Sequence, residues 1–148
     1  MKKRASRIEA KKKKNLHKAF VKILLKSPIT NLKFSKNGAK ISFNFFNHKI
    51  SDRIKVRKVD HVAEWSRRRR EISIDKKFGE KEVEKSFRAL CLHEALERFL
   101  VKEFGLNTDQ EAHIVATQKE KEYLKSIHGN WKSHELKVFW DWHKMGEH

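Results

Sequence analysis

Residues 80–104 contain no proline or glycine, and apolar side chains occupy nearly every face of the helix that they predict between Leu90 and Val101. A helix that is apolar all round is buried inside a protein rather than laid on its surface. Gly105 follows directly and is a typical C-terminal stop. The chain must therefore fold around this segment, and 148 residues are enough for one domain with a hydrophobic core.

Three ionisable residues interrupt this apolar run: His93, Glu94 and Glu97. His93 and Glu97 are spaced i, i+4, so their side chains lie on one face of the helix and can converge on one ion, with Glu94 beside them. Burying two carboxylates is costly unless something compensates their charge. A divalent metal is one compensation, and ion pairs with Arg88 and Arg98 are the structural alternative.

A third metal ligand is expected from the following segment. Thr108 and Glu111 have the spacing of a capping box, which predicts a second helix that runs to about Lys125. His113 lies in its first two turns, where the chain returns beside the buried helix. The predicted ligands are therefore His93, Glu97 and His113. Two histidines and one glutamate favour a single Zn²⁺ per chain and leave a position open for water, as in catalytic sites.

These features resemble the zincin metallopeptidases, particularly their minimal gluzincin type. The likeness rests on a short strand ("EISID"), a charged linker ("KKFGEKEVEKS"), the His-Glu-x-x-ligand helix and a further ligand after it. Zincins have HExxH, whereas this chain has HExxE at residues 93–97. The resemblance implies His93 as the first ligand, Glu94 as the general base for a metal-bound water, Glu97 in place of the second histidine, and His113 as the last ligand. "HEALE" followed by "EAH" is also similar to small proteins of archaea and their viruses.

The function that the resemblance implies is a zinc-dependent hydrolase, a peptidase or peptidase-like protein, acting on a peptide or protein substrate. It also implies that the strand at Ile72–Asp75 is a sheet edge that holds the substrate as an added strand. Arg67–Arg70 would flank that edge, either favouring an acidic substrate or keeping other chains from pairing with it. An inactive zincin-fold binding protein is an alternative.

The rest of the chain predicts an α+β, zincin-like fold in one domain, residues 1–148. Residues 1–26 form a basic helix whose apolar residues have helical spacing: Leu16, Ala19, Phe20, Ile23 and Leu24. Residues 39–75 form a small three-stranded sheet, with strands within 39–50, within 51–59 and around Ile72 and Ile74. Residues 80–148 form the helical metal-site part, in which two further helices follow the buried one. His134 in "HELKV" is interpreted as helix surface.

The net charge of +17 is concentrated in the front half of the chain: residues 1–26 carry 11 basic and 1 acidic side chains. Such asymmetry favours a polyanion partner. The alternative function is therefore a basic nucleic-acid-binding protein, which would use Lys11, Lys12, Lys13, Lys14 and Arg67, Arg68, Arg69, Arg70. A Lys/Glu-rich surface that serves solubility is the other interpretation of this charge.

The single cysteine, Cys91, cannot form an internal disulfide, and no stretch approaches the roughly 20 apolar residues that span a bilayer. The N-terminus is basic but lacks the apolar core and cleavage site of a secretory signal. A cytoplasmic protein without a membrane partner is expected.

Overall fold

The computed structural model describes residues 12, 16–57, 63–76, 84–136 and 138. A helix over residues 16–26 comes first. Five strands follow: β1 (Ile29–Phe34), β2 (Lys40–Phe45), β3 (His48–Arg57), β4 (Ala63–Trp65) and β5 (Glu71–Asp75). The helical part consists of α2 (Glu84–Phe104), a π-helical turn η3 (Thr108–Ala112), α3 (His113–Ser126) and a helix over residues 131–136. The protein is thus α+β, as predicted.

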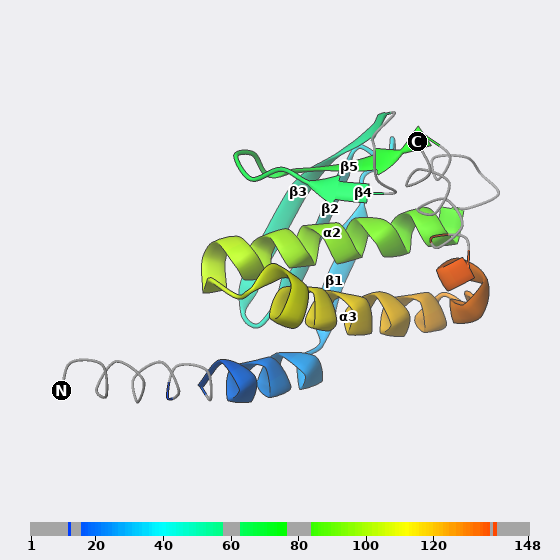
Figure 1. Ribbon diagram of the computed structural model, residues 1–148. Helices are drawn as coiled ribbons and strands as arrows, with labels where there is room; N and C mark the ends of the chain where they lie inside the picture. The colour runs from blue at the N-terminus through cyan, green and yellow to red at the C-terminus, as the bar shows by residue number, and fades with distance from the viewer. Residues whose placement is uncertain (1–11, 13–15, 58–62, 77–83, 137, 139–148) are drawn as a thin grey trace, which may run out of the picture.

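The strands form one mixed sheet in the order β1-β2-β3-β5-β4 (Figure 1). Strands β3 and β5 are parallel, and the other neighbours are antiparallel. The predicted number of three strands is wrong, because β1 and β4 are also present. β1 does not have a regular period of two, since Asn31 has a positive φ of 53° and the register shifts between Thr30 and Lys33. β4 has only three residues, too few for a pattern.

The boundary between the first two predicted strands is also wrong. β2 ends at Phe45 and β3 begins at His48, so Ser51 lies inside β3 instead of at its start. The hairpin turn is formed by Phe46 and Asn47, which have φ of 50° and 62°. Positive φ at both central residues is the mark of a type I′ turn, whose twist matches that of the strands, but phenylalanine is a rare residue for it.

The sheet edge beside the helices is β4, not Ile72–Asp75. β5 lies between β3 and β4, and all five of its residues are buried. The parallel register with β3 pairs Ile54 with Ile72, which places β5 inside the sheet. The short strand β4 then covers β5 on its other side, through Trp65 opposite Ile72. Any strand added at this side of the sheet would thus meet β4.

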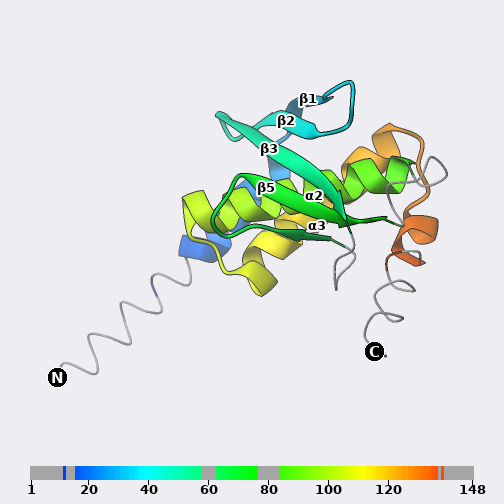
Figure 2. The same cartoon turned by 90° about the horizontal axis from the view of Figure 1, so that it is seen from above.

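Helix α2 crosses one face of the sheet and is itself covered by α3 (Figures 1 and 2). Its residues from Ala89 to Glu97 are all buried, as the apolar pattern predicted. Cys91 is fully buried among them and behaves as a small apolar residue. Gly105 ends α2 with φ of 64°, and the amide of Leu106 donates to the carbonyl of Leu100 at 3.2 Å. The amide of Gly105 itself donates to the carbonyl of Val101 at 3.1 Å, which is the αL type of helix end and favours a residue that tolerates positive φ.

The second helix begins one residue earlier than the capping pattern predicted. The Asn107 side-chain oxygen accepts from the amide of Gln110 at 3.1 Å, and the Glu111 carboxylate accepts from the amide of Asn107 at 2.7 Å. Asn107, and not Thr108, is therefore the cap. From Asn107 to Glu111 there is one residue more than in an ordinary capping box. The π-helical turn η3 accommodates this residue, and it leads into α3, where His113 faces α2.

Helix 16–26 packs on the rest of the molecule, but not all of the apolar residues that were predicted to form its packed face are buried. Leu24 is fully buried, whereas Leu16 and Ile23 are 69% and 53% exposed. The buried Lys119 of α3 donates to the carbonyl of Leu25 at 2.8 Å, which ties the C-terminal end of this helix to α3. None of the helices in the described part of the chain is long and apolar enough to cross a membrane.

Candidate metal centre

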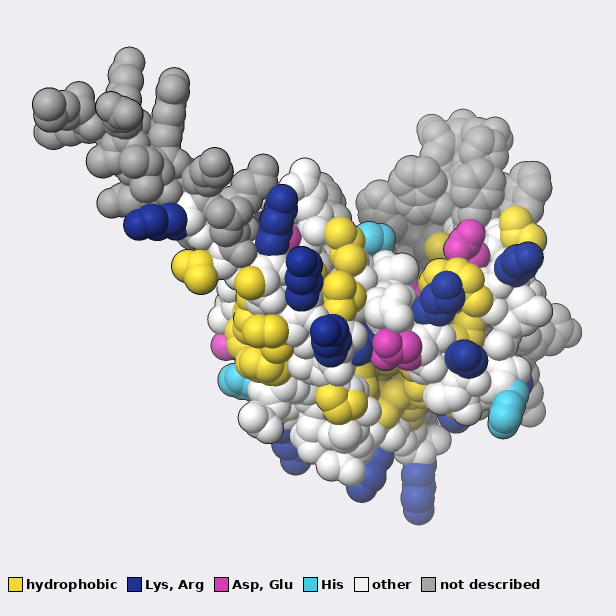
Figure 3. Space-filling model, turned by 90° about the horizontal axis from the view of Figure 1, so that it is seen from below, with side chains coloured by type: hydrophobic (Ala, Val, Ile, Leu, Met, Phe, Trp, Pro, Cys, Tyr) yellow, Lys and Arg dark blue, Asp and Glu magenta, His cyan; other side chains and the backbone are white. Residues whose placement is uncertain are grey.

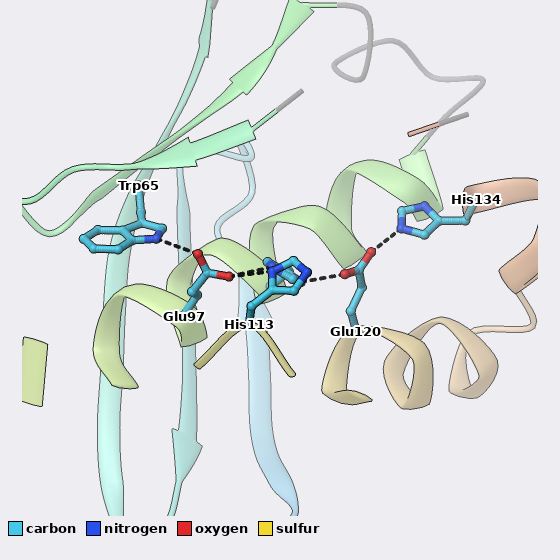
Figure 4. Close-up of polar contacts among 6 residues, drawn as sticks. Trp65, Glu97, His113, Glu120 and His134 are labelled. Atoms are coloured by element: carbon cyan, nitrogen blue, oxygen red, sulfur yellow. Dashed lines mark hydrogen bonds and ion pairs between the residues drawn. The ribbon is translucent and has the colours of Figure 1, made fainter. Parts of the chain in front are cut away.

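The three predicted ligands, His93, Glu97 and His113, lie together where α2 meets the start of α3 (Figure 4). Glu97 Oε2 is 2.9 Å from His93 Nε2 and 3.0 Å from His113 Nδ1. One ligand atom from each residue lies within 4.8 Å of the other two. Tetrahedral zinc ligands at about 2.1 Å from the ion are about 3.4 Å apart, so Glu97 Oε2 would move away from each histidine by about half an ångström while the ligand atoms that lie farther apart come closer.

The trio is buried on one side and open on the other. The side chains of His93 and Glu97 are 8% and 10% exposed, whereas that of His113 is 56% exposed. The ring centroids of the two histidines are 4.8 Å apart. Solvent therefore has access to the space between the three ligand atoms on the side of His113. An ion held there would keep access to water, which a closed structural site does not allow.

The remaining polar atoms of the two buried ligands are each held by another residue (Figure 4). The indole nitrogen of Trp65, on β4, donates to Glu97 Oε1 at 3.0 Å. Glu120 Oε1, on α3, lies 2.7 Å from His93 Nδ1. Such partners fix the orientation of a metal ligand and leave one defined atom free for the ion, here His93 Nε2 and Glu97 Oε2.

The sequence did not single out Trp65 or Glu120 as part of the site. Glu120 lies two helical turns after His113, and this spacing was the signal available for its role. For Trp65 there was no comparable signal, because its contact depends on the placement of a three-residue edge strand.

The interpretation of His134 as helix surface is wrong. This residue is 2% exposed, and its Nε2 contacts Glu120 Oε2 in the buried interior. The helix over 131–136 turns His134 inward because Asn130 caps it, accepting from the amide of Ser133 at 3.0 Å. Glu120 thus lies between two histidines, and a continuous chain of polar contacts runs from Trp65 to His134.

These contacts set the protonation of the cluster. Burial lowers the pKa of His93, but hydrogen bonds to Glu120 and Glu97 outweigh it and raise that pKa to about 10. Burial alone would raise the pKa of Glu97, yet hydrogen bonds from His113 and His93 bring it down to about 2. The pKa of Glu120 is lowered in the same way by His134 and His93. Without a metal, His93 is therefore a cation that donates to a carboxylate on each side.

Glu94 lies beside the cluster in a different environment. It is 9% exposed, and no hydrogen bond to its carboxylate is present among the described residues. Burial raises its pKa, and so do the neighbouring carboxylates of Glu97 and Glu120, while the histidines lower it, with the result that its pKa is about 7. A carboxylate with this pKa can exchange a proton near neutral pH.

Ion pairs with arginines were the alternative to a metal as compensation for the buried carboxylates of α2, but Arg98 binds another residue. Arg98 donates to both oxygens of Asp52 on β3, at 2.7 and 3.0 Å. The guanidinium of Arg88 lies over the ring of Phe34, 5.3 Å from its centroid. The charges that hold Glu97 and Glu120 are instead the histidines, which are also the residues that can ligate a metal.

Of the predicted nucleic-acid residues, Arg67 contacts this cluster through Trp65. Arg67–Arg70 form the exposed loop between β4 and β5, and Arg67 lies 5.7 Å above the centroid of the Trp65 ring. Lys12 is exposed. Lys11, Lys13 and Lys14 fall outside the described residues, so their part in binding stays a prediction.

No family model, no curated protein and no solved structure matches this chain.

Proposed function

We propose that this protein is a metal-dependent hydrolase of the zincin-like type, with one zinc ion held by His93, Glu97 and His113. The observation that carries the proposal is the meeting of these three ligand atoms from two helices, with the outer atoms of the buried pair already bonded to Trp65 and Glu120. The donor set fits zinc, because imidazole and carboxylate are its common protein ligands. When bound, such an ion acidifies a water molecule and polarises a carbonyl group.

Glu94 is proposed as the general base. It follows His93 directly, and burial together with the charges of the same cluster sets its pKa. A base is most effective when its pKa lies close to the working pH, and a pKa of about 7 meets that condition. Its low exposure also keeps bulk water from competing for the proton.

A peptide is the proposed substrate, held against the free edge of β4. This strand pairs with β5 on one side, and Trp65 at its end contacts the metal ligand Glu97. An extended peptide that adds to a sheet edge gains main-chain hydrogen bonds there. Its backbone would then run past the open side of the metal trio.

Elemental analysis of protein purified without a histidine tag tests the metal site. We expect about one zinc per chain in the wild type and none in His113→Ala, which should fold because His113 is largely exposed. His128→Asn is the matched control, since His128 is exposed and asparagine tolerates its positive φ of 60°. Metal-free wild type after incubation with excess zinc would mean that the His/Glu cluster is only an ion-pair network.

The variant Glu94→Gln then tests whether the protein is an enzyme or an inactive binding protein. The substitution keeps the shape of the side chain but removes the base. A hydrolase should retain its zinc and lose its cleavage of a peptide library by at least about a hundredfold. Full zinc content with no cleavage even in the wild type would support the inactive alternative.

A further inference from the structure

The two faces of the sheet differ sharply in character. The inner face carries apolar residues that meet α2, among them Ile41, Phe43 and Ile54. The outer face is polar, because buried and more exposed residues alternate along β2 and over most of β3. On β1 to β3 the outward residues are Lys33, Lys40, Ser42, Asn44, Lys49, Ser51, Arg53, Lys55 and Arg57, and the basic ones are all exposed. All helices in the described part of the chain lie on the inner side of the sheet (Figures 1 and 2).

On β1 to β3 the charge of this outer face is of one sign. Between residues 27 and 57 the only acidic residue is Asp52, and it points to the inner side, where Arg98 binds it. Lys40 lies directly opposite Arg53 in the antiparallel pair of β2 and β3. Like charges at directly opposite positions destabilise a sheet. A surface that served only solubility would intersperse both signs, as does the face of the molecule that carries helix 16–26 (Figure 3).

Only part of this charge is neutralised from within. Lys55 pairs with Glu71 at 3.6 Å, and Arg57 pairs with Glu64 at 3.5 Å. Lys33, Lys40 and Lys49 remain on strands that offer no acidic neighbour on this face.

Loop 67–70, which holds four exposed arginines, adjoins this surface at its last residue. The amide of Arg53 donates to the carbonyl of Arg70 at 2.9 Å, so the end of the loop lies beside the basic row of β3, whereas Arg67 at its start lies over the ring of Trp65. From Lys49 to Arg57 the outward row on β3 is about 26 Å long, at about 3.3 Å per residue. Basic side chains thus extend over a flat area three strands wide and into an exposed loop.

We propose that the outer face of β1 to β3, together with loop 67–70, is a docking surface for the backbone of duplex nucleic acid. The partner is argued from charge complementarity, since a duplex carries about one phosphate charge per 1.7 Å of its axis. The outward positions of these strands hold no aromatic residue on which single-stranded bases could stack. The face has no protruding element in the described residues that could enter a groove, so binding is independent of base sequence.

Fluorescence anisotropy with a labelled, mixed-sequence DNA duplex about two helical turns long tests this surface in the full chain. The test variant is Lys33→Gln/Lys40→Gln/Lys49→Gln. Its matched control is Lys102→Gln/Lys121→Gln/Lys125→Gln, which removes the same charge from exposed positions on α2 and α3. We expect the test variant to bind at least about tenfold more weakly at 0.1 M salt, and the control to bind within about threefold of the wild type.

The salt dependence of binding gives a second readout. The slope of log K against log salt should become shallower by about 0.9 for each lysine that contacts a phosphate in the wild type. Equal losses in the test variant and the control would overturn the proposal, because they would reflect net charge alone. Tighter binding to the matching single strand than to the duplex would overturn it as well. Zinc content, measured beside binding, should be the same in both variants, so this result is independent of the metal site.

Discussion

Trp65 donates to one oxygen of Glu97 at 3.0 Å, while the other oxygen of Glu97 faces His93 and His113. The edge strand β4 is thereby bonded to the buried helix α2 at the metal trio. One residue of the sheet thus controls which carboxylate oxygen is available to an ion.

Replacement of Trp65 by phenylalanine should weaken zinc binding by about 10- to 100-fold, because the hydrogen bond that orients Glu97 is lost while most of the ring packing is kept. Competition with a chromophoric chelator measures the affinity. Thermal unfolding of the metal-free protein serves as the control and should change little. A normal zinc affinity in Trp65→Phe would show that the indole does not orient the ligand.

That the three proposed ligands lie together could be predicted because it depends on local periodicity. The i, i+4 spacing of His93 and Glu97 holds in any helix, and the return after Gly105 brought His113 to the same place. The contacts of Trp65 and His134 could not be predicted, since each depends on the register of a short element that no pattern marks. The same holds for the strand count, because β1 is irregular at Asn31 and β4 has only three residues. The boundary between β2 and β3 was missed because the turn at Phe46 looks like continuous strand in the sequence.

Glu120→Gln should lower zinc affinity by about 10- to 100-fold, because a neutral amide orients the His93 ring less firmly than a carboxylate does. Glu122→Gln is the matched control on the same helix: its side chain is 49% exposed and contacts Lys119, away from the histidines. Isothermal titration of both metal-free variants with zinc measures the difference. Equal affinities in the two would contradict the positioning role of Glu120.

The pH dependence of zinc binding follows from the pKa of His93. Its pKa of about 10 in the metal-free protein means that zinc must displace a proton from Nε2 at neutral pH. Above the pKa of Glu94, which is about 7, and below that of His93, the apparent affinity should rise about tenfold per pH unit. A titration in weak buffer should release about one proton per zinc from His93 in this range. An affinity that is flat with pH would mean that His93 is already neutral.

The same group makes the metal-free protein sensitive to base. Because the folded-state pKa of His93 is raised above its ordinary value of 6.5, its contribution to stability is complete below pH 6.5 and is lost as the pH rises toward 10. The melting temperature of chelator-treated protein should therefore fall over this range. Zinc-loaded protein should lack that loss, since the ion takes the place of the proton.

The buried ion pair of Asp52 and Arg98 joins β3 to α2, with side chains 0% and 11% exposed. Asp52→Ala should lower the free energy of unfolding by roughly 3–5 kcal/mol, because it leaves the Arg98 guanidinium buried without a partner. The double variant Asp52→Leu/Arg98→Met should recover most of this loss, since apolar residues of similar size replace both charges. Urea unfolding of the single and double variants measures both effects. A double variant as unstable as Asp52→Ala would indicate that packing, and not the unpaired charge, causes the loss.

Two N-terminal truncations should have different effects. Removal of residues 1–15 should reduce the positive charge without affecting folding, whereas removal of residues 1–26 should also destabilise the fold. Residues 1–15 carry eight basic and one acidic side chains, so their removal lowers the net charge from +17 by 7 to +10. Removal of residues 1–26 would also delete the fully buried Leu24 and the Leu25 carbonyl that Lys119 binds.

We expect the shorter truncation to keep the melting temperature and to weaken duplex binding, because Lys11–Lys14 are lost. The longer truncation should unfold at a clearly lower temperature, since a buried leucine contributes about 2–5 kcal/mol and Lys119 would lose its acceptor. Equal stability of the two truncated proteins would contradict the contacts of helix 16–26 with α3.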